Sequence, residues 1–190
     1  MRLFVAAIIA FLVFPAASAR ANDWHAGPGV AYVTKINDVV DIYQANVRAQ
    51  GKSVEVDKPF PLGVTFDAHY QMDGGLRIGF GLGPYFRLSG DAKHFELPLN
   101  GTVGFNFMPQ EQVSAYVKGG LVHHFASGDY YESSQPGLLA AGGVELAKQG
   151  SLSFTIELAF DSSKIELDVI PGTTTKLRSY ETVLSFFVKF

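Results

Sequence analysis

Apolar and polar residues alternate along most of the chain. The segment 152–161 reads LSFTIELAFD, in which every second residue is large and apolar. A period of two is typical of a β-strand with one apolar face. The pattern recurs, in full or in part, in eight segments: 24–34, 62–72, 76–88, 95–107, 113–125, 138–146, 152–161 and 180–190. An even number of such strands is what an antiparallel up-and-down barrel needs, so we expect an all-β, eight-stranded barrel.

The links between these segments differ in length. Tight turns at 73–75, 109–112 and 148–151 alternate with longer links at 37–60, 128–135 and 162–178, and 89–93 is a short exception. Short turns on one rim, longer loops on the other and both termini at the short-turn rim are typical of an outer-membrane barrel. The first long link contains NDVVDIYQANVRAQG, which predicts a short helix capped by Asn37, with Val40, Tyr43 and Val47 on one face.

Alternation alone does not separate a membrane barrel from a soluble one, whose apolar face points inward. Here the less apolar face is rich in Gly, Ala, Ser, Thr and Asn, which suits a narrow lumen better than a water-exposed wall. Aromatic residues collect near the segment ends, as interfacial girdles do. The segments are also long enough for tilted strands to cross a bilayer. We therefore expect the apolar faces to meet lipid.

The N-terminus carries a targeting pattern. Arg2 precedes an apolar run from Leu3 to Phe14, and small residues follow at Ala17 and Ala19. This is the layout of a secretory signal peptide covering 1–19, with cleavage after residue 21 as the alternative. The barrel domain is then 22–190, and the expected location is the cell outer membrane.

Composition excludes several classes of protein. The chain has no cysteine, so disulfide scaffolds and thiol chemistry are excluded. Its formal charge is −3 without a basic run, so we expect no nucleic-acid partner. The five histidines show no metal-ligand spacing, and we expect neither a metal nor a cofactor.

The inward faces carry charged residues of both signs. We expect them to form a structural network of ion pairs and hydrogen bonds, because a buried charge needs a partner. The predicted interior network consists of Asp67, Arg77, Arg87, Glu96, Lys118, His124, Glu145, Glu157, Asp161, Glu181 and Lys189. We predict no catalytic residue among them.

The signal peptide, the eight strands and a last strand that ends on Phe190 resemble the small outer-membrane barrels of Gram-negative bacteria. These are the opacity-protein, outer-membrane protein A and outer-membrane protein X groups. The resemblance implies that the barrel-assembly machinery reads the last strand. It also implies outer-membrane lipid and lipopolysaccharide as surroundings. The matching positions of the assembly signal are Tyr180, Leu184, Phe186, Val188 and Phe190.

The expected function is non-enzymatic, in envelope integrity or in surface interaction with a host or another cell through the long loops. Tyr130, Tyr131, Val169 and Ile170 are expected to be exposed there. One alternative is a lipid A deacylase-like enzyme at the rim. In those barrels a Ser follows a His by two residues on one strand, whereas here Ala126 follows His124. The second alternative is a small porin-like channel.

Overall fold

The computed structural model describes residues 23–34, 36–51, 62–88, 93–146, 152–170, 173–178 and 181–190. The predicted signal peptide and both of its cleavage sites lie outside these ranges, as does the tight turn predicted at 148–151. Among the described residues, no helix combines the length and the apolar character needed to cross a membrane.

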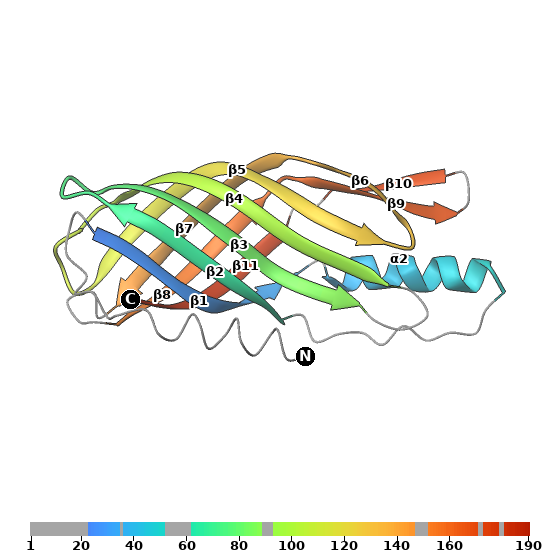
Figure 1. Ribbon diagram of the computed structural model, residues 1–190, viewed down its shortest axis with the longest axis horizontal. Helices are drawn as coiled ribbons and strands as arrows, with labels where there is room; N and C mark the ends of the chain where they lie inside the picture. The colour runs from blue at the N-terminus through green and yellow to red at the C-terminus, as the bar shows by residue number, and fades with distance from the viewer. Residues whose placement is uncertain are drawn as a thin grey trace.

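Eight strands of the described chain close into a barrel in the order β1-β11-β8-β7-β5-β4-β3-β2 (Figure 1). Neighbouring strands are antiparallel throughout, and β1 pairs with β11 to complete the ring. The predicted fold class is confirmed, and every strand ends within three residues of its predicted bounds. The bounds are β1 Asp23–Val33, β2 Leu62–Gln71, β3 Leu76–Leu88, β4 His94–Asn106, β5 Ser114–Gly128, β7 Gly137–Leu146, β8 Ser153–Asp161 and β11 Glu181–Lys189.

The outer wall of the barrel is apolar. In β8 the side chains alternate strictly between buried and exposed, and the exposed ones are Phe154, Ile156, Leu158 and Phe160. The inward positions of the same strand carry Ser, Thr, Glu, Ala and Asp. A wall that exposes its large apolar residues and buries its charges is arranged for lipid, which confirms the predicted orientation of the faces. The same holds on other strands, with exposed Val30, Tyr32, Val64, Ile78, Phe80, Leu99, Val103, Val117, Leu121, Val144, Leu184 and Phe186.

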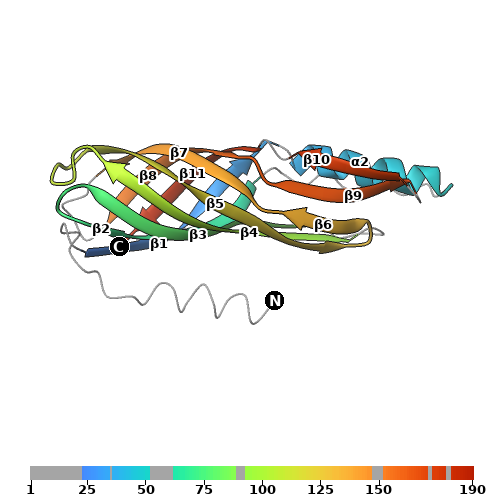
Figure 2. The ribbon, with the colours of Figure 1, turned by 90° about the horizontal axis from the view of Figure 1, so that it is seen from above.

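A second structured region, here called the cap, extends beyond the long-loop rim. It consists of the helix α2 Ile36–Ala49 and a three-stranded sheet, β10-β9-β6, with β6 Tyr131–Gln135, β9 Lys164–Ile170 and β10 Thr173–Arg178. Figure 2 shows the helix and the sheet continuing past the barrel along its long axis. Three separate links between barrel strands therefore fold together outside the wall.

The cap has an apolar core of its own. Val40, Tyr43 and Val47 lie on one face of α2, as predicted, and they pack with Ile165 and Leu167 of β9. Each of these side chains is buried. Because the apolar stripe of α2 meets the apolar alternation of β9, neither element needs lipid to cover it.

Three predictions about the long links need correction. The helix begins at Ile36, so Asn37 lies in its first turn and is not the N-cap. The links at 128–135 and 162–178, predicted as loops, contain β6, β9 and β10. Tyr130 and Tyr131 are only partly exposed, because they pack against the cap core. The side chains of Val169 and Ile170 lie outside the described residues.

The strand β3 is irregular near its outer end. Its pairing shifts between Val64 and Phe66 on the β2 side and between Leu82 and Phe86 on the β4 side. Gly83 has φ of 87°, a conformation that glycine adopts without a steric penalty. Pro84 of β3 and Pro98 of β4 both lack the backbone N–H that pairing with a neighbouring strand requires. Between Leu82 and Phe86, β3 contains one more residue than the facing part of β4. This extra residue reverses which side chains of β3 point outward beyond it.

The last residue takes part in closing the barrel. The backbone N–H of Phe190 donates to the carbonyl of Ala26 at 2.9 Å, and its carbonyl accepts from the N–H of Ala26 at 3.2 Å. Leu184, Phe186 and Val188, from the predicted assembly signal, face outward on β11. Tyr180, the first member of that set, lies outside the described residues.

The outward face can be tested at Ile156, which is 42% exposed near the middle of β8. Replacing it with Arg should cost roughly 2–4 kcal/mol of unfolding free energy, because a guanidinium would face hydrocarbon. The measurement is urea unfolding of the protein in lipid vesicles, followed by the fluorescence of the single tryptophan, Trp24. Ile156→Leu is the control and should unfold like the original chain. An equal loss in both variants would contradict the assignment.

The role of Phe190 can be tested by removing it. Deletion should lower the assembled fraction, because it removes both backbone bonds to Ala26 and the terminal aromatic ring. Phe190→Ala keeps the backbone bonds, and so separates the two effects. The readout is the heat-sensitive band of the folded barrel on a gel of the membrane fraction. Unchanged assembly of the deleted chain would show that Phe190 is dispensable.

Candidate functional site

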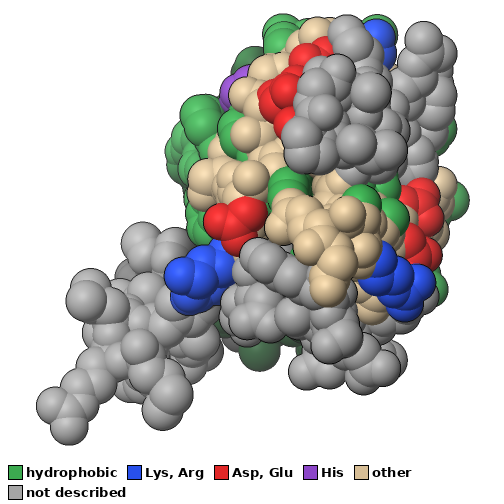
Figure 3. Space-filling model, turned by 90° about the vertical axis from the view of Figure 1, so that its right-hand side faces the viewer, with side chains coloured by type: hydrophobic (Ala, Val, Ile, Leu, Met, Phe, Trp, Pro, Cys, Tyr) green, Lys and Arg blue, Asp and Glu red, His purple; other side chains and the backbone are tan. Residues whose placement is uncertain are grey.

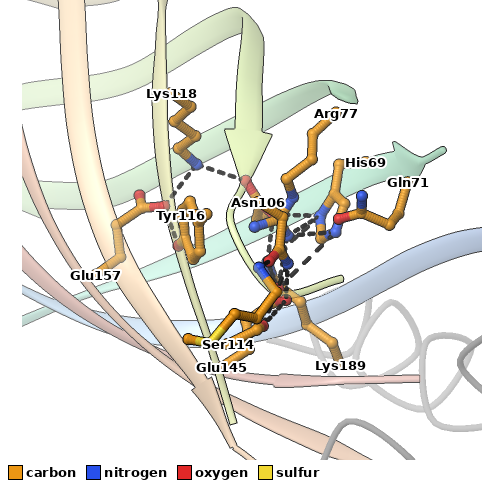
Figure 4. Close-up of polar contacts among 12 residues, drawn as sticks. His69, Gln71, Arg77, Asn106, Ser114, Tyr116, Lys118, Glu145, Glu157 and Lys189 are labelled. Atoms are coloured by element: carbon orange, nitrogen blue, oxygen red, sulfur yellow. Dashed lines mark hydrogen bonds and ion pairs between the residues drawn. The ribbon is translucent and has the colours of Figure 1, made fainter. Parts of the chain in front are cut away.

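The lower half of the lumen, toward the short-turn rim, holds a network of buried ion pairs. Arg77 Nη2 lies 2.5 Å from Glu145 Oε1, and Lys189 Nζ lies 2.6 Å from Asp67 Oδ1. Lys189 Nζ also lies 4.0 Å from Glu145 Oε1, so the two pairs form one cluster. All four side chains are almost fully buried, and they come from β2, β3, β7 and β11. Strands that are not neighbours in the sheet are therefore joined through the barrel interior (Figure 4).

Lys118 extends this network toward the middle of the barrel. Its Nζ lies 2.9 Å from Asp67 Oδ2 and 2.7 Å from Glu157 Oε2. The Tyr116 hydroxyl donates to Glu157 at 2.5 Å, and the Arg77 guanidinium lies over the Tyr116 ring at 4.1 Å. Figure 4 shows Lys118 and Tyr116 both directed at Glu157. The tyrosine thus fills space and satisfies a carboxylate at the same time.

The charges of this lower network balance. It contains the carboxylates of Asp67, Glu145 and Glu157 and the cations of Arg77, Lys118 and Lys189. Removing one member would leave an uncompensated buried charge, which costs far more than an exposed ion pair contributes. The network is therefore held together as a unit, and it fills the lumen at this level.

Apolar side chains separate the lower network from the outer mouth. Ala31, Val122, Leu139, Ala159 and Val183 form a buried cluster across five strands. A cavity of about 40 Å³ lies beside it, between the polar layers. That volume suits one or a few waters, far less than a drug-sized ligand occupies.

A second buried network lies at the outer mouth, centred on His124. Its Nε2 is 2.6 Å from Asp161 Oδ2, and its Nδ1 faces Glu96 Oε1 in a short contact. A neutral imidazole carries hydrogen on only one nitrogen. Since both nitrogens face carboxylates, His124 is held as the imidazolium between two anions. The bonded groups come from β4, β5 and β8.

This outer network reaches the cap through Tyr43. The Tyr43 hydroxyl lies 2.9 Å from His94 Nδ1, and His94 Nε2 lies 3.4 Å from Glu96 Oε2. Burial raises the pKa of the Tyr43 hydroxyl well above its usual range, so this hydroxyl stays protonated in its hydrogen bond to His94. A chain of hydrogen bonds therefore runs from α2 through His94, Glu96 and His124 to Asp161. It joins the cap to the barrel wall.

Further contacts join the cap to the barrel and the elements of the cap to one another. The Ser134 hydroxyl of β6 donates to the backbone carbonyl of His124 at 2.6 Å. The Asn46 side chain of α2 donates to the Asp168 carbonyl of β9 at 2.5 Å. These bonds fix the helix and the sheet in position, so the cap is a folded unit attached at several points.

The structure places most of the predicted interior residues inside the barrel. Asp67, Arg77, Glu96, Lys118, His124, Glu145, Glu157, Asp161 and Lys189 all contact an oppositely charged or polar partner there. For Glu181, the backbone pairs with Asp161 and the side chain lies outside the described residues. Arg87 is a correction, because it is exposed. The irregularity of β3 at residues 83–85 reverses its face.

Sequence reasoning also missed interior residues. His25 and His94 are buried, and Tyr116 and His69 join the lower network. The rings of His25 and His69 stack 5.0 Å apart and nearly parallel. His69 and Tyr116 lie on the inward face by alternation, but the predicted network does not include them. His94 could not be placed, because it begins the strand one residue before the predicted start.

The His124 ring and the Ser134 hydroxyl are bonded to other groups and not to one another. Both ring nitrogens of His124 face carboxylates, and the neighbouring hydroxyl of Ser134 bonds to a backbone carbonyl. Within the described ranges, no group of three His, Cys, Asp or Glu side chains is positioned to hold a metal ion.

Neither a family model nor a curated protein matches the sequence. Solved structures do match the fold. The chain resembles neisserial surface protein A with a TM-score of 0.53 and 16% identity, over 87% of this chain and 95% of that one. It resembles the outer-membrane protein OprG of Pseudomonas aeruginosa with a TM-score of 0.56 and 12% identity, over 91% and 98%.

The outer-membrane protein AlkL, determined in lipid bilayers, matches with a TM-score of 0.50 and 14% identity, over 93% of this chain and 92% of that one. This chain has the fold of the small eight-stranded outer-membrane β-barrels. At these identities the likeness shows the fold alone, so the interior and the cap must be interpreted from this chain's own residues.

The link between the barrel and the cap can be tested at His124. His124→Asn should loosen the cap, because Glu96 and Asp161 would lose the cation between them. The measurement is the rate of trypsin cleavage after Arg48, an exposed residue of α2, in protein whose barrel remains folded on a gel. We expect faster cleavage at this bond.

The matched control is His123→Asn. His123 is adjacent in sequence but points outward, where its ring contacts Phe125. This variant should be cleaved at the original rate. Equal rates for both variants would show that the outer network does not hold the cap.

Proposed function

We propose that this protein is a non-enzymatic outer-membrane protein whose barrel holds the cap outside the cell for contact with a host or another cell. The supporting observation is the buried core that α2 shares with β9. Long loops that only joined strands would not need such a core. A folded cap presents a fixed surface, which lowers the ordering cost of binding a partner.

The barrel interior favours a role in holding the cap over a role in transport. The charges of the lower network balance and are bonded to one another across the lumen. The apolar cluster above them and the small cavity leave little room for a solute. A closed barrel whose strands are joined by ion pairs through the lumen is a rigid support for the cap.

The exposed surface of the cap is polar and mixed in charge. Asp38 and Arg48 are exposed on α2, and Glu132 and Gln135 are exposed on β6. Seen from the cap end, acidic side chains lie next to basic ones at more than one place on the surface (Figure 3). A mixed pattern of charge favours recognition of a partner with the complementary pattern.

The proposal can be tested by destroying the cap without the barrel. Val40 is fully buried in the cap core, so Val40→Asp should unfold the cap by placing a carboxylate in an apolar site. A deletion strain complemented with this variant should adhere to host cells as poorly as the deletion strain. Val40→Ile, which keeps an apolar side chain at the same buried position, is the control and should restore adhesion.

The experiment separates the proposed role from its rivals. The heat-sensitive gel band must show that the Val40→Asp barrel is assembled. Full adhesion of this variant would overturn the proposal. A lipid A mass profile that changes with the protein would point to the enzyme instead. Stable single-channel openings in planar bilayers would point to the channel.

A further inference from the structure

The corrected position of Arg87 creates a basic site on the outer wall. Arg87 lies directly opposite Phe95 in the β3–β4 pairing, and its side chain is exposed. His94 and Glu96 on either side of Phe95 are buried, so Phe95 and Arg87 share the outward face. Within the described ranges, no carboxylate forms an ion pair with Arg87.

Lys93 lies next to Arg87 on the same face. It precedes Phe95 by two residues, which makes it the diagonal neighbour of Arg87, roughly 7–8 Å away by strand geometry. Its side chain is exposed, and its backbone N–H donates to the Asp129 carboxylate at 2.8 Å. Two exposed cations therefore lie at this rim, Arg87 near the outer end of β3 and Lys93 just before the start of β4.

Apolar and aromatic groups lie directly below these cations. The rings of Tyr85 and Phe95 meet edge to face at 5.4 Å. Phe125 of β5, which pairs with Leu97, is 50% exposed. On β7, the last outward apolar residue toward the cap is Leu138, which pairs with Leu121 of β5. On β5 the apolar wall continues beyond Leu121 to Phe125.

We propose that this face binds a phosphorylated lipid of the outer leaflet, with a headgroup phosphate on Arg87 and Lys93 and acyl chains along Leu97 and Phe125. A guanidinium and an ammonium are suited to phosphate oxygens. Their place above an aromatic girdle is the headgroup level of a bilayer. The apolar extension below them is continuous with the lipid-facing wall, which is what selects a lipid as the occupant.

The proposal uses the orientation in which the long-loop rim faces outward, as the proposed function does. It does not depend on the cap or on any adhesion partner. Failure of the adhesion test would leave it standing, and its own failure would leave the proposed function standing.

The test is a titration of the purified barrel, in zwitterionic detergent, with bisphosphorylated lipid A. Native mass spectrometry measures the fraction of protein that retains the lipid. Arg87→Ala should weaken binding about five-fold, since one basic contact to anionic lipid is lost. Arg87→Glu should weaken it further. Dephosphorylated lipid A should bind weakly to the original chain and to both variants.

Arg48→Ala is the matched control, because it removes an exposed arginine of the cap, away from the proposed face. It should bind lipid A like the original chain, and the gel band confirms that every variant is folded. Equal binding by Arg87→Ala and the original chain would overturn the proposal, as would equal binding of the dephosphorylated lipid. So would a lipid-free dimer abolished by Phe125→Ser, which would place a second copy on this face.

Discussion

Closure of the sheet is the constraint on which the structure depends. A backbone that crosses lipid must pair every N–H and carbonyl within the protein, and only a sheet without edges does so with strands. The β1–β11 pairing supplies that closure, and the bonds between Ala26 and Phe190 extend it to the last residue. Once the sheet is closed, each side chain on a strand faces either lipid or a narrow lumen.

The lumen is narrow because eight strands enclose little space. Charges placed there have no bulk water, so each must be paired by its neighbours. This explains the balanced network of Asp67, Glu145 and Glu157 with three cations, and also the imidazolium of His124 between two carboxylates. The same pairing that makes the charges tolerable joins strands that are distant in the sheet. The interior thereby stiffens the barrel that holds the cap.

The two rims of the barrel differ in structure. At the short-turn rim the chain turns tightly, as at Gly75, whose φ of 91° suits a glycine. At the other rim the strands continue into a region with its own apolar core. The chain of contacts from Tyr43 to Asp161 joins the apolar core of the cap to the buried charges of the barrel. The cap is consequently held by the barrel, while the outer wall of the barrel keeps its apolar side chains exposed.

The sequence by itself determined the eight strands, their faces and most of the buried charges, because a period of two is a local property that each strand carries alone. It also placed Val40, Tyr43 and Val47 on one helical face. Only the tertiary structure decided what covers that face, since β9 approaches it from more than a hundred residues away. It likewise decided the side of Arg87, because one irregularity in β3 reverses every later position and leaves no mark on the alternation. Pairings such as Lys189 with Asp67 depend on which strands meet across the lumen, and that is fixed only when the barrel closes.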